Sequence, residues 1–335
     1  MSIDISLFEQ AKEKIDQAKS ILITSHKSPD GDSVGCSVGL YQYLKKLNKT
    51  VQICHPDNAP HFLTWIKGSE DIISFENDSD KVRECFFKSD LIFCLDYNAS
   101  YRLCSDMEKL LDDSNANKIL IDHHPNPSIN AVVSISDVSR SSTSELICEL
   151  IDSLGDAALI DHLISEPLYA GMITDTGSFR YPSVSSRTHD IVSLLLKSGI
   201  DHSMVHSNIY DTNSIDRLKL RSFAVCNKME ILDHYPLGII SLTKEELERY
   251  NFQKGDTEGL VNVILSVEGV KIGVILIEKG GCIKMSFRSK EQYYVNEFAN
   301  KYFNGGGHKY AAGGMSELSI DDTINKLKSL IPELF

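Results

Sequence analysis

The sequence predicts an α/β fold in which a parallel-sheet, Rossmann-like first domain is followed by a second, smaller α+β domain. Short apolar runs without polar alternation, typical of parallel strands buried on both faces, alternate with helical patterns through the first half of the chain. Closely spaced strand patterns replace this alternation after residue 225. Two domains also suit the length, because 335 residues with 42% apolar composition exceed what one core usually holds.

The first domain is expected to span residues 1–190. Residues 1–20 place Ile5, Phe8 and Ala11 at helical spacing between charges, which predicts an amphipathic surface helix. The strands of the sheet are predicted at residues 21–24, 51–54, 91–96, 118–122 and 132–136. Helices are predicted between them at 37–47 and 143–154, and the apolar segment 168–174 is interpreted as a further strand.

A helical connector is expected at residues 191–225 and the second domain at 226–335. The segment 188–199 has the spacing of a helix, whereas 201–222 is polar and has few apolar anchors. Strands are predicted at residues 237–243, 270–280 and 281–289, the last two joined across a Gly-Gly turn, and a helix at 291–303.

Composition excludes some functions. The net charge of −13 argues against an electrostatic grip on long nucleic acid, which needs many lysines and arginines. We expect no membrane association, because no apolar segment approaches the ~18 residues of a membrane span and the N-terminus does not resemble a signal peptide. Eight cysteines without a C-x-x-C pair indicate reduced thiols and a cytoplasmic location.

Polar side chains follow several of the predicted strands at the point where each strand ends. They are His26, Asp30 and Asp32 after 21–24, Asp96 at the end of 91–96, Asp122, His123 and His124 after 118–121, and Asp175 after 168–174. The carboxyl ends of parallel strands meet at one edge of a sheet, where ligands bind. These side chains are therefore expected to converge on a single site.

Imidazoles and carboxylates without thiolates suit Mn²⁺ or Mg²⁺ better than a structural zinc site. Five acidic groups and three histidines exceed the needs of one ion. They fit two ions about 3.5–4 Å apart, a pair that activates water and neutralises a phosphoryl group. Each motif alone could be an ordinary polar turn, and the hypothesis depends on their coincidence at one sheet edge.

Four sequence motifs resemble those of the DHH phosphoesterase superfamily in their usual order: HKSPDGDS, LDYN, IDHHPN and GMITDTGSFRYP. The C-terminal GGGHKYAAGG, with SFRS upstream, resembles the DHH-associated domain. Within the superfamily the chain is most similar to the group of bifunctional oligoribonucleases (nanoRNases) and pAp phosphatases, because the additional DNA-binding modules of RecJ are missing.

The resemblance implies two Mn²⁺ ions, for which Mg²⁺ or Co²⁺ could substitute, with Asp96 shared between them. The other ligands would be His26 and Asp30 on one ion, and Asp32, His123 and Asp175 on the other. Asp122 would orient the site, and His124 would donate to the substrate phosphate or act as a general acid. The residues alone leave open which of the two adjacent histidines is a ligand.

Further substrate contacts are expected from arginines and from the glycine-rich segment. Arg140, Arg180 and Arg187 lie near the motifs and could bind phosphate, with surface salt bridges as the alternative. A pocket for a terminal phosphate or base is predicted in the second domain, with a flexible hinge as the alternative. Its residues are Arg288, Ser289, Gly305, Gly306, Gly307 and His308.

These expectations favour a Mn²⁺-dependent phosphoesterase whose active cleft lies between the domains. Its substrates would be short single-stranded RNA oligomers, hydrolysed to mononucleotides, and 3′-phosphoadenosine 5′-phosphate (pAp), hydrolysed to AMP. The alternatives are a phosphodiesterase for cyclic dinucleotides or pApA, a RecJ-like exonuclease for single-stranded DNA, a pyrophosphatase, and an inactive nucleotide-binding regulator. The resemblance also makes a homodimer plausible.

Overall fold

The computed structural model describes residues 3–253, 255–290 and 292–335, and it divides into two compact units, Met1–Thr212 and Asn213–Phe335. The segment expected to be a connector is shared between them. Helix α8 (His202–Tyr210) belongs to the first unit and α9 (Ile215–Lys228) to the second. No helix among the described residues is both long and apolar enough to cross a membrane.

The first unit is built on a six-stranded sheet with the order β3-β2-β1-β4-β5-β6, in which every neighbouring pair is parallel. Its strands are β1 (Ile21–Ser25), β2 (Val51–His55), β3 (Ile72–Ser74), β4 (Leu91–Leu95), β5 (Asn117–Asp122) and β6 (Val133–Ser136). The predicted parallel sheet is thereby confirmed, with the short edge strand β3 added. The chain reverses its winding direction between β1 and β4, which makes their carboxyl ends the topological switch point.

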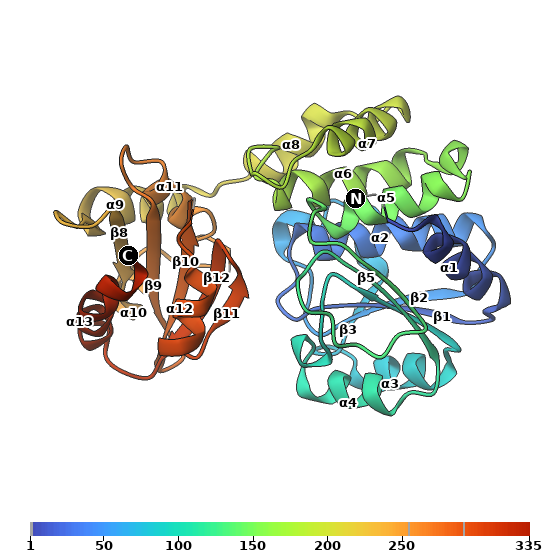
Figure 1. The fold of residues 1–335 in the computed structure, drawn as a ribbon, viewed down its shortest axis with the longest axis horizontal. Helices are drawn as coiled ribbons and strands as arrows, with labels where there is room; N and C mark the ends of the chain where they lie inside the picture. The colour runs from blue at the N-terminus through green and yellow to red at the C-terminus, as the bar shows by residue number, and fades with distance from the viewer. Residues whose placement is uncertain (1–2, 254, 291) are drawn as a thin grey trace. The chain divides into compact units, whose positions relative to one another are not determined.

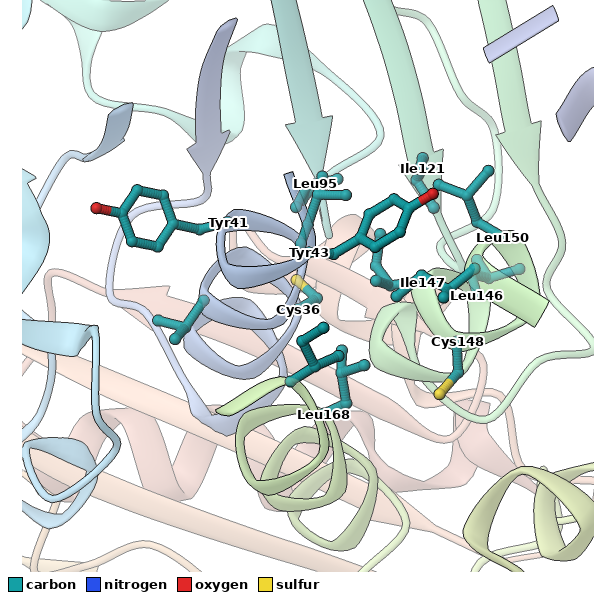
Figure 2. Packing of buried hydrophobic residues seen from close by; sticks show 14 of the residues in the cluster. Cys36, Tyr41, Tyr43, Leu95, Ile121, Leu146, Ile147, Cys148, Leu150 and Leu168 are labelled. Carbon is teal, nitrogen blue, oxygen red and sulfur yellow. The ribbon is translucent and has the colours of Figure 1, made fainter. Parts of the chain in front are cut away.

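Helices cover both faces of this sheet (Figure 1). Those of the unit are α1 (Ile5–Gln17), α2 (Gly31–Lys46), α3 (Ser79–Lys88), α4 (Ser105–Asp113), α5 (Thr143–Ser153), α6 (His162–Asp175), α7 (Ser186–Lys197) and α8. Successive strand residues point to opposite faces, so Leu22 packs with the α3–α4 layer while Ile21 and Ile23 pack with α1, α2 and α5. Figure 2 shows the second layer, where side chains of α2 and α5 meet Leu95 and Ile121.

The segment 168–174 is not a strand but part of helix α6, and this prediction was wrong. Its residues up to Ile173 are buried, because α6 packs against α2, α5, α7 and α8. A helix that is buried on all sides has no polar face, so its apolar run is not distinguished from a buried strand by periodicity. Asp175 is therefore the last residue of a helix.

Helices α2 and α6 approach closely at two glycines. A Cβ atom on Gly35 would lie 2.4 Å from the carbonyl oxygen of Pro167 and 3.0 Å from the Cα of Gly171. A Cβ on Gly171 would in turn lie 2.9 Å from a carboxylate oxygen of Asp32. The small residues thus let α6 lie directly beside the segment that carries Asp32.

The second unit contains a mixed sheet with the order β11-β12-β10-β9-β8-β7, in which only β8 and β9 are parallel neighbours. Its elements are α9, β7 (Met229–Ile231), β8 (Leu237–Leu242), α10 (Lys244–Arg249), α11 (Leu260–Leu265), β9 (Ile272–Lys279), β10 (Cys282–Ser289), α12 (Val295–Tyr302), β11 (Gly306–His308), β12 (Ala311–Ser316) and α13 (Ile320–Leu330). Residues of α9, α10 and α11 pack on one face of the sheet and those of α12 and α13 on the other. Gly280 and Gly281, both at positive φ, form the turn predicted between β9 and β10. The predicted helix at 291–303 corresponds to α12, and residue 291 lies outside the described residues.

We predict that Gly35→Ala lowers the free energy of unfolding of the first unit by about 1–3 kcal/mol, because the added methyl group meets backbone atoms that cannot rotate away. Gly39→Ala is the matched control, since the three atoms nearest to its Cβ would all belong to the side chain of Leu168 and none to the backbone, so its loss of stability should be smaller. Urea unfolding followed by the fluorescence of Trp65, the one tryptophan of the chain, measures both variants. A Gly35→Ala protein as stable as the parent would contradict the close approach.

Candidate metal centre

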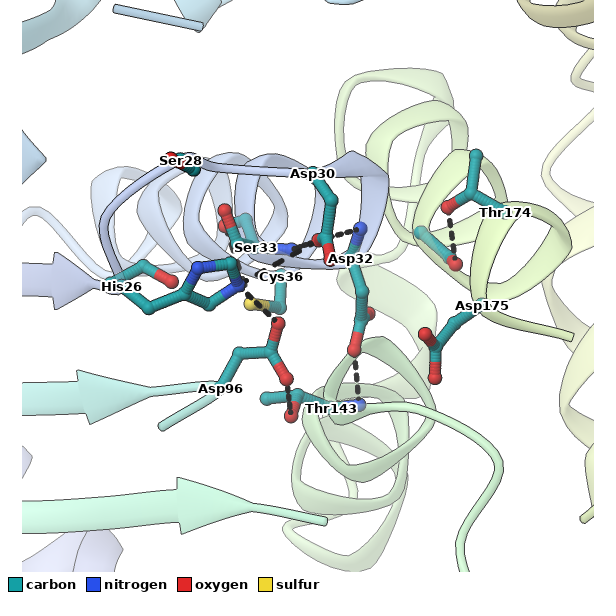
Figure 3. A network of polar contacts seen from close by, with 12 residues as sticks. His26, Ser28, Asp30, Asp32, Ser33, Cys36, Asp96, Thr143, Thr174 and Asp175 are labelled. Carbon is teal, nitrogen blue, oxygen red and sulfur yellow. Dashed lines mark hydrogen bonds and ion pairs between the residues drawn. The ribbon is translucent and has the colours of Figure 1, made fainter. Parts of the chain in front are cut away.

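The predicted ligands come together at the switch point of the first sheet. His26 follows β1, Asp96 follows β4 and Asp122 ends β5, so all three lie at the carboxyl edge. Figure 3 shows the side chains of Asp30, Asp32 and Asp175 directed toward the same space from the N-terminus of α2 and the C-terminus of α6. The cluster therefore draws on three strands and two helices of one unit.

The geometry forms overlapping groups of potential ligands. Three sets offer atoms that all lie within 4.8 Å of one another: His26 with Asp30 and Asp96, Asp32 with His123 and Asp175, and Asp96 with His123 and His124. Asp96 belongs to the first and third sets and also lies close to His123 of the second. Its Oδ2 lies 3.3 Å from Nε2 of His26, and its Oδ1 lies 3.5 Å from Nε2 of His123.

The two histidines beside Asp96 have the same orientation. Nδ1 of His26 lies 2.9 Å from the carbonyl oxygen of Lys27, and Nδ1 of His123 lies 3.4 Å from that of Arg140. A carbonyl oxygen can only accept, so each Nδ1 carries a proton and each Nε2 is the ring atom that faces the carboxylates. These contacts favour the tautomer that a metal ligand requires.

His124 is oriented differently from its neighbour. Its Nδ1 lies 2.7 Å from Oδ1 of Asp122, a fully buried carboxylate whose other oxygen has no hydrogen-bond partner among the described residues. The rings of His123 and His124 meet edge to face, with centroids 4.7 Å apart. Adjacent histidines thus serve different polar partners, a distinction that the sequence does not reveal.

Asp32 is held by the N-terminus of helix α5. The backbone N–H groups of Thr143 and Ser144 donate to its two oxygens at 2.6 and 2.9 Å, and the hydroxyl of Thr143 donates to Asp96 at 3.0 Å. Helix N-termini favour negative charge. Thr143 and Ser144 were not among the predicted site residues, although the serine- and threonine-rich start of a predicted helix was an available signal.

Electrostatics indicate that the centre needs positive charge. Burial, with the nearby carboxylates of Asp32 and Asp30, raises the pKa of Asp96 well above its usual range. Although burial opposes it, the carboxylates of Asp175, Asp96 and Asp32 raise the pKa of His123 to about 9. Crowded carboxylates repel one another and take up protons unless other positive charge is close. Divalent cations are suited to supply that charge.

The donor set consists of oxygen and nitrogen atoms only. The nearby thiol of Cys36 is buried, and burial together with the Asp32 and Asp96 charges raises its pKa well above the usual range. It therefore stays protonated and is a poor ligand. The remaining carboxylates and imidazoles fit a hard or borderline cation, such as Mg²⁺ or Mn²⁺.

The arginines near the motifs have protein partners. Arg140 pairs with Asp137 at 3.2 Å and Glu149 at 2.9 Å, and Arg187 pairs with the other oxygen of Glu149 at 3.0 Å. Nε of Arg180 donates to the carbonyl oxygen of Gly177. Through its own carbonyl oxygen, Arg140 also positions His123. Phosphate binding by these arginines stays a prediction.

The predicted nucleotide pocket lies in the second unit. Arg288 of β10 and His308 of β11 both pair with Ala311 of β12, so the sheet brings them to the same level. The side chain of His308 lies outside the described part of the chain. The hydroxyl of Ser289 donates to the carbonyl oxygen of Tyr293. Substrate contacts by these residues stay predictions.

The glycines of the pocket differ in their surroundings. A Cβ on Gly305 or Gly307 would lie 2.0 or 2.4 Å from a carbonyl oxygen of β12, so close backbone packing requires glycine at both positions. Gly306 has no atom within 4 Å of the place a Cβ would take. Only Gly306 therefore has open space beside it.

A cluster of this composition at the switch point of a doubly wound sheet is suited to hold divalent cations around a phosphate group. The fold and the site together define the class of protein, a two-domain α/β hydrolase of phosphate esters.

Comparison with known proteins identifies the family. The model of the DHH family, N-terminal domain, matches residues 20–172, and that of the DHHA1 domain matches residues 240–334. The chain belongs to the DHH family, which confirms the resemblance seen in its motifs.

Three relatives span most of the chain. A solved structure of an exopolyphosphatase-related protein from Bacteroides fragilis is 36% identical, with a TM-score of 0.95 over 99% of this chain and 97% of that one. The probable bifunctional oligoribonuclease and PAP phosphatase NrnA of Streptococcus mutans is 28% identical over 98% of this chain and 100% of its own. The bifunctional oligoribonuclease and PAP phosphatase NrnA of Bacillus subtilis is 26% identical over 88% of each.

We predict that Asp96→Asn stabilises the metal-free protein and abolishes its stabilisation by Mn²⁺. The raised pKa means that an ionised Asp96 costs stability at every pH above its unfolded value of about 3.9, and asparagine removes that charge. Asparagine also tolerates the φ of 63° at this position. The melting temperature of the metal-free variant should rise by about 2 °C or more.

Thermal unfolding of metal-stripped protein, with and without added Mn²⁺, measures both effects. The control is Asp190→Asn, which alters an exposed carboxylate of α7 and should behave like the parent. A metal-free Asp96→Asn protein that melts below the parent, or one that Mn²⁺ stabilises as strongly, would contradict the shared position of Asp96.

Proposed function

We propose that the protein is a Mn²⁺-dependent phosphoesterase that hydrolyses short oligoribonucleotides to mononucleotides and pAp to AMP. The single observation that carries this proposal is the place of Asp96 between two ligand sets, His26 with Asp30 and Asp32 with His123 and Asp175. The relatives from Streptococcus mutans and Bacillus subtilis, named as oligoribonucleases and PAP phosphatases, suggest the substrate class.

The two ligand sets would each hold one ion, with Asp96 contributing an oxygen to both. Bound there, the ions would supply charge neutralisation for the phosphate and a water of lowered pKa. The protein's own contribution is to fix these ligands before substrate arrives. The carbonyl oxygens of Lys27 and Arg140 set the two imidazoles, and the N-terminus of α5 sets Asp32.

His124 would donate a proton to the leaving oxygen. Burial lowers the pKa of His124, and the hydrogen-bonded Asp122 carboxylate opposes that effect. An incoming phosphate anion adds to the influence of Asp122 and favours the protonated imidazole. With Nδ1–H held by Asp122, the proton on Nε2 is the one available for transfer.

The second unit would bind the end of the substrate. Arg288, whose strand position lies at the same level of the sheet as position 308, and the backbone of the glycine segment 305–307 would offer a cationic group and N–H donors for a terminal nucleotide. A site that binds only the end of the substrate gains little binding energy from a longer RNA. The net charge of −13 agrees with this, because a short substrate brings few phosphates to neutralise.

Metal-stripped protein reconstituted with Mn²⁺ should cleave a labelled diribonucleotide and pAp, and should cleave long RNA, single-stranded DNA and pyrophosphate much more slowly. The physical reason is the end-binding pocket, which rewards short substrates that carry a nucleoside. Initial rates on the five substrates, measured side by side, check this expectation. Equal or faster cleavage of the long polymers would contradict the proposed substrate class.

His124→Ala should lower kcat by roughly 10²–10⁴-fold while Mn²⁺ still stabilises the protein, because a proton donor is lost and the ion ligands stay. The control His162→Ala alters an exposed histidine at the start of α6 and should keep full activity. His124 also belongs to a potential ligand set with Asp96 and His123. The stabilisation of the variant by Mn²⁺ therefore decides between the two roles of His124. Loss of Mn²⁺ stabilisation in His124→Ala would make His124 a ligand instead of the acid.

A further inference from the structure

The short helix η3 (Ser100–Arg102) lies between the loops that carry the candidate ligands. The backbone N–H of Lys27, next to His26, donates to the carbonyl oxygen of Arg102 at 2.9 Å. On the other side, Asn98 donates through Nδ2 to Pro125 at 2.7 Å and accepts from the N–H of Ser128 at 2.7 Å. The segment that follows Asp96 is therefore tied to the loop after β1 and to the loop after β5.

The side chain of Arg102 differs from those of the other arginines near the motifs. It is half-buried, yet its guanidinium makes no hydrogen bond or ion pair with any described residue. Arg140 and Arg187, in contrast, are engaged by Glu149 and neighbouring carboxylates. A partly desolvated guanidinium in a region rich in carboxylates normally has an anionic partner, and a missing one indicates an anion that arrives from outside.

Arg102 also acts on the proposed proton donor. The guanidinium of Arg102 lies within electrostatic reach of the His124 imidazole. The backbone of η3 is anchored through the Arg102 carbonyl oxygen, independently of the side chain. The side chain can thus be replaced without releasing the loop.

We propose that Arg102 contacts the phosphate group that undergoes hydrolysis, on the side of His124. This inference rests on the proposed function and assigns the arginine that the sequence left open. A guanidinium offers two parallel donors that match two phosphate oxygens. The carboxylates of the centre are negative and repel a phosphate. Together with the ions, the guanidinium would surround the phosphate with positive charge.

The test uses the full chain loaded with Mn²⁺ and three substrates: a diribonucleotide without a 5′-phosphate, the same dinucleotide with one, and pAp. Arg102→Ala should lose roughly 10- to 100-fold in kcat/KM on all three alike, because each contains the scissile phosphate. Arg102→Lys should recover part of that loss through its charge. The control Arg83→Ala, which removes an exposed arginine paired with Asp106, should change little.

Two further measurements separate a phosphate contact from a structural role. The melting temperature and its rise with Mn²⁺ should be unchanged in Arg102→Ala, since the guanidinium has no partner in the described protein. Calorimetric binding of AMP to the Mn²⁺-loaded protein should weaken. A lowered melting temperature with unchanged AMP binding would overturn the proposal in favour of a structural role.

The outcomes also separate this inference from the proposed function. Full activity of Arg102→Ala on all substrates would overturn the inference alone, and so would a loss confined to the substrates with a second phosphate. If the parent protein cleaves none of the three substrates, the proposed function fails. In that case the binding of inorganic phosphate to the Mn²⁺-loaded protein tests whether Arg102 contacts phosphate. Equal affinity in the parent and in Arg102→Ala would overturn the inference.

Discussion

Mutual repulsion among the carboxylates around Asp96 is the constraint on which the rest of the site depends. Asp96 is buried, lies between two imidazoles and faces further carboxylates, and its pKa is raised accordingly. The surrounding structure counters this repulsion with fixed donors: the N-terminus of α5 on Asp32 and the hydroxyl of Thr143 on Asp96. These donors hold the carboxylates close to one another, and the fold thereby forms a site suited to divalent cations.

The doubly wound topology determines where this cluster can form. Strands β1 and β4 are neighbours in the sheet although about 70 residues separate them in the chain, as the pairing of Ile21 with Leu91 shows. His26 and Asp96 consequently meet at the switch point. The close approach of α2 and α6 at Gly35 and Gly171 then brings the end of α6, with Asp175, to the same place. The strand order of the sheet and the close approach of two helices at these glycines thus bring ligands from distant parts of the unit together.

The sequence predicted the parallel sheet and the paired strands of the smaller α+β domain, because uniformly apolar strands and a Gly-Gly turn at Gly280–Gly281 leave clear patterns. It did not distinguish α6 from a strand, since a helix buried on all sides is apolar throughout. The contacts of Thr143 and Ser144 were missed because Asp32 and Asp96, which are distant in the sequence, meet them only in the folded chain. Arg102 was missed because its relevant feature is a side chain without a hydrogen-bond partner among the described residues. Such features follow from three-dimensional packing, and residue type alone does not encode them.

The binding of two cations that share Asp96 is tested most directly by electron paramagnetic resonance of metal-stripped protein titrated with Mn²⁺. We expect two ions for each chain and an exchange-coupled signal, because ions that share a carboxylate lie about 3.5–4 Å apart. A single bound ion, or two ions whose signals stay uncoupled at saturation, would contradict it.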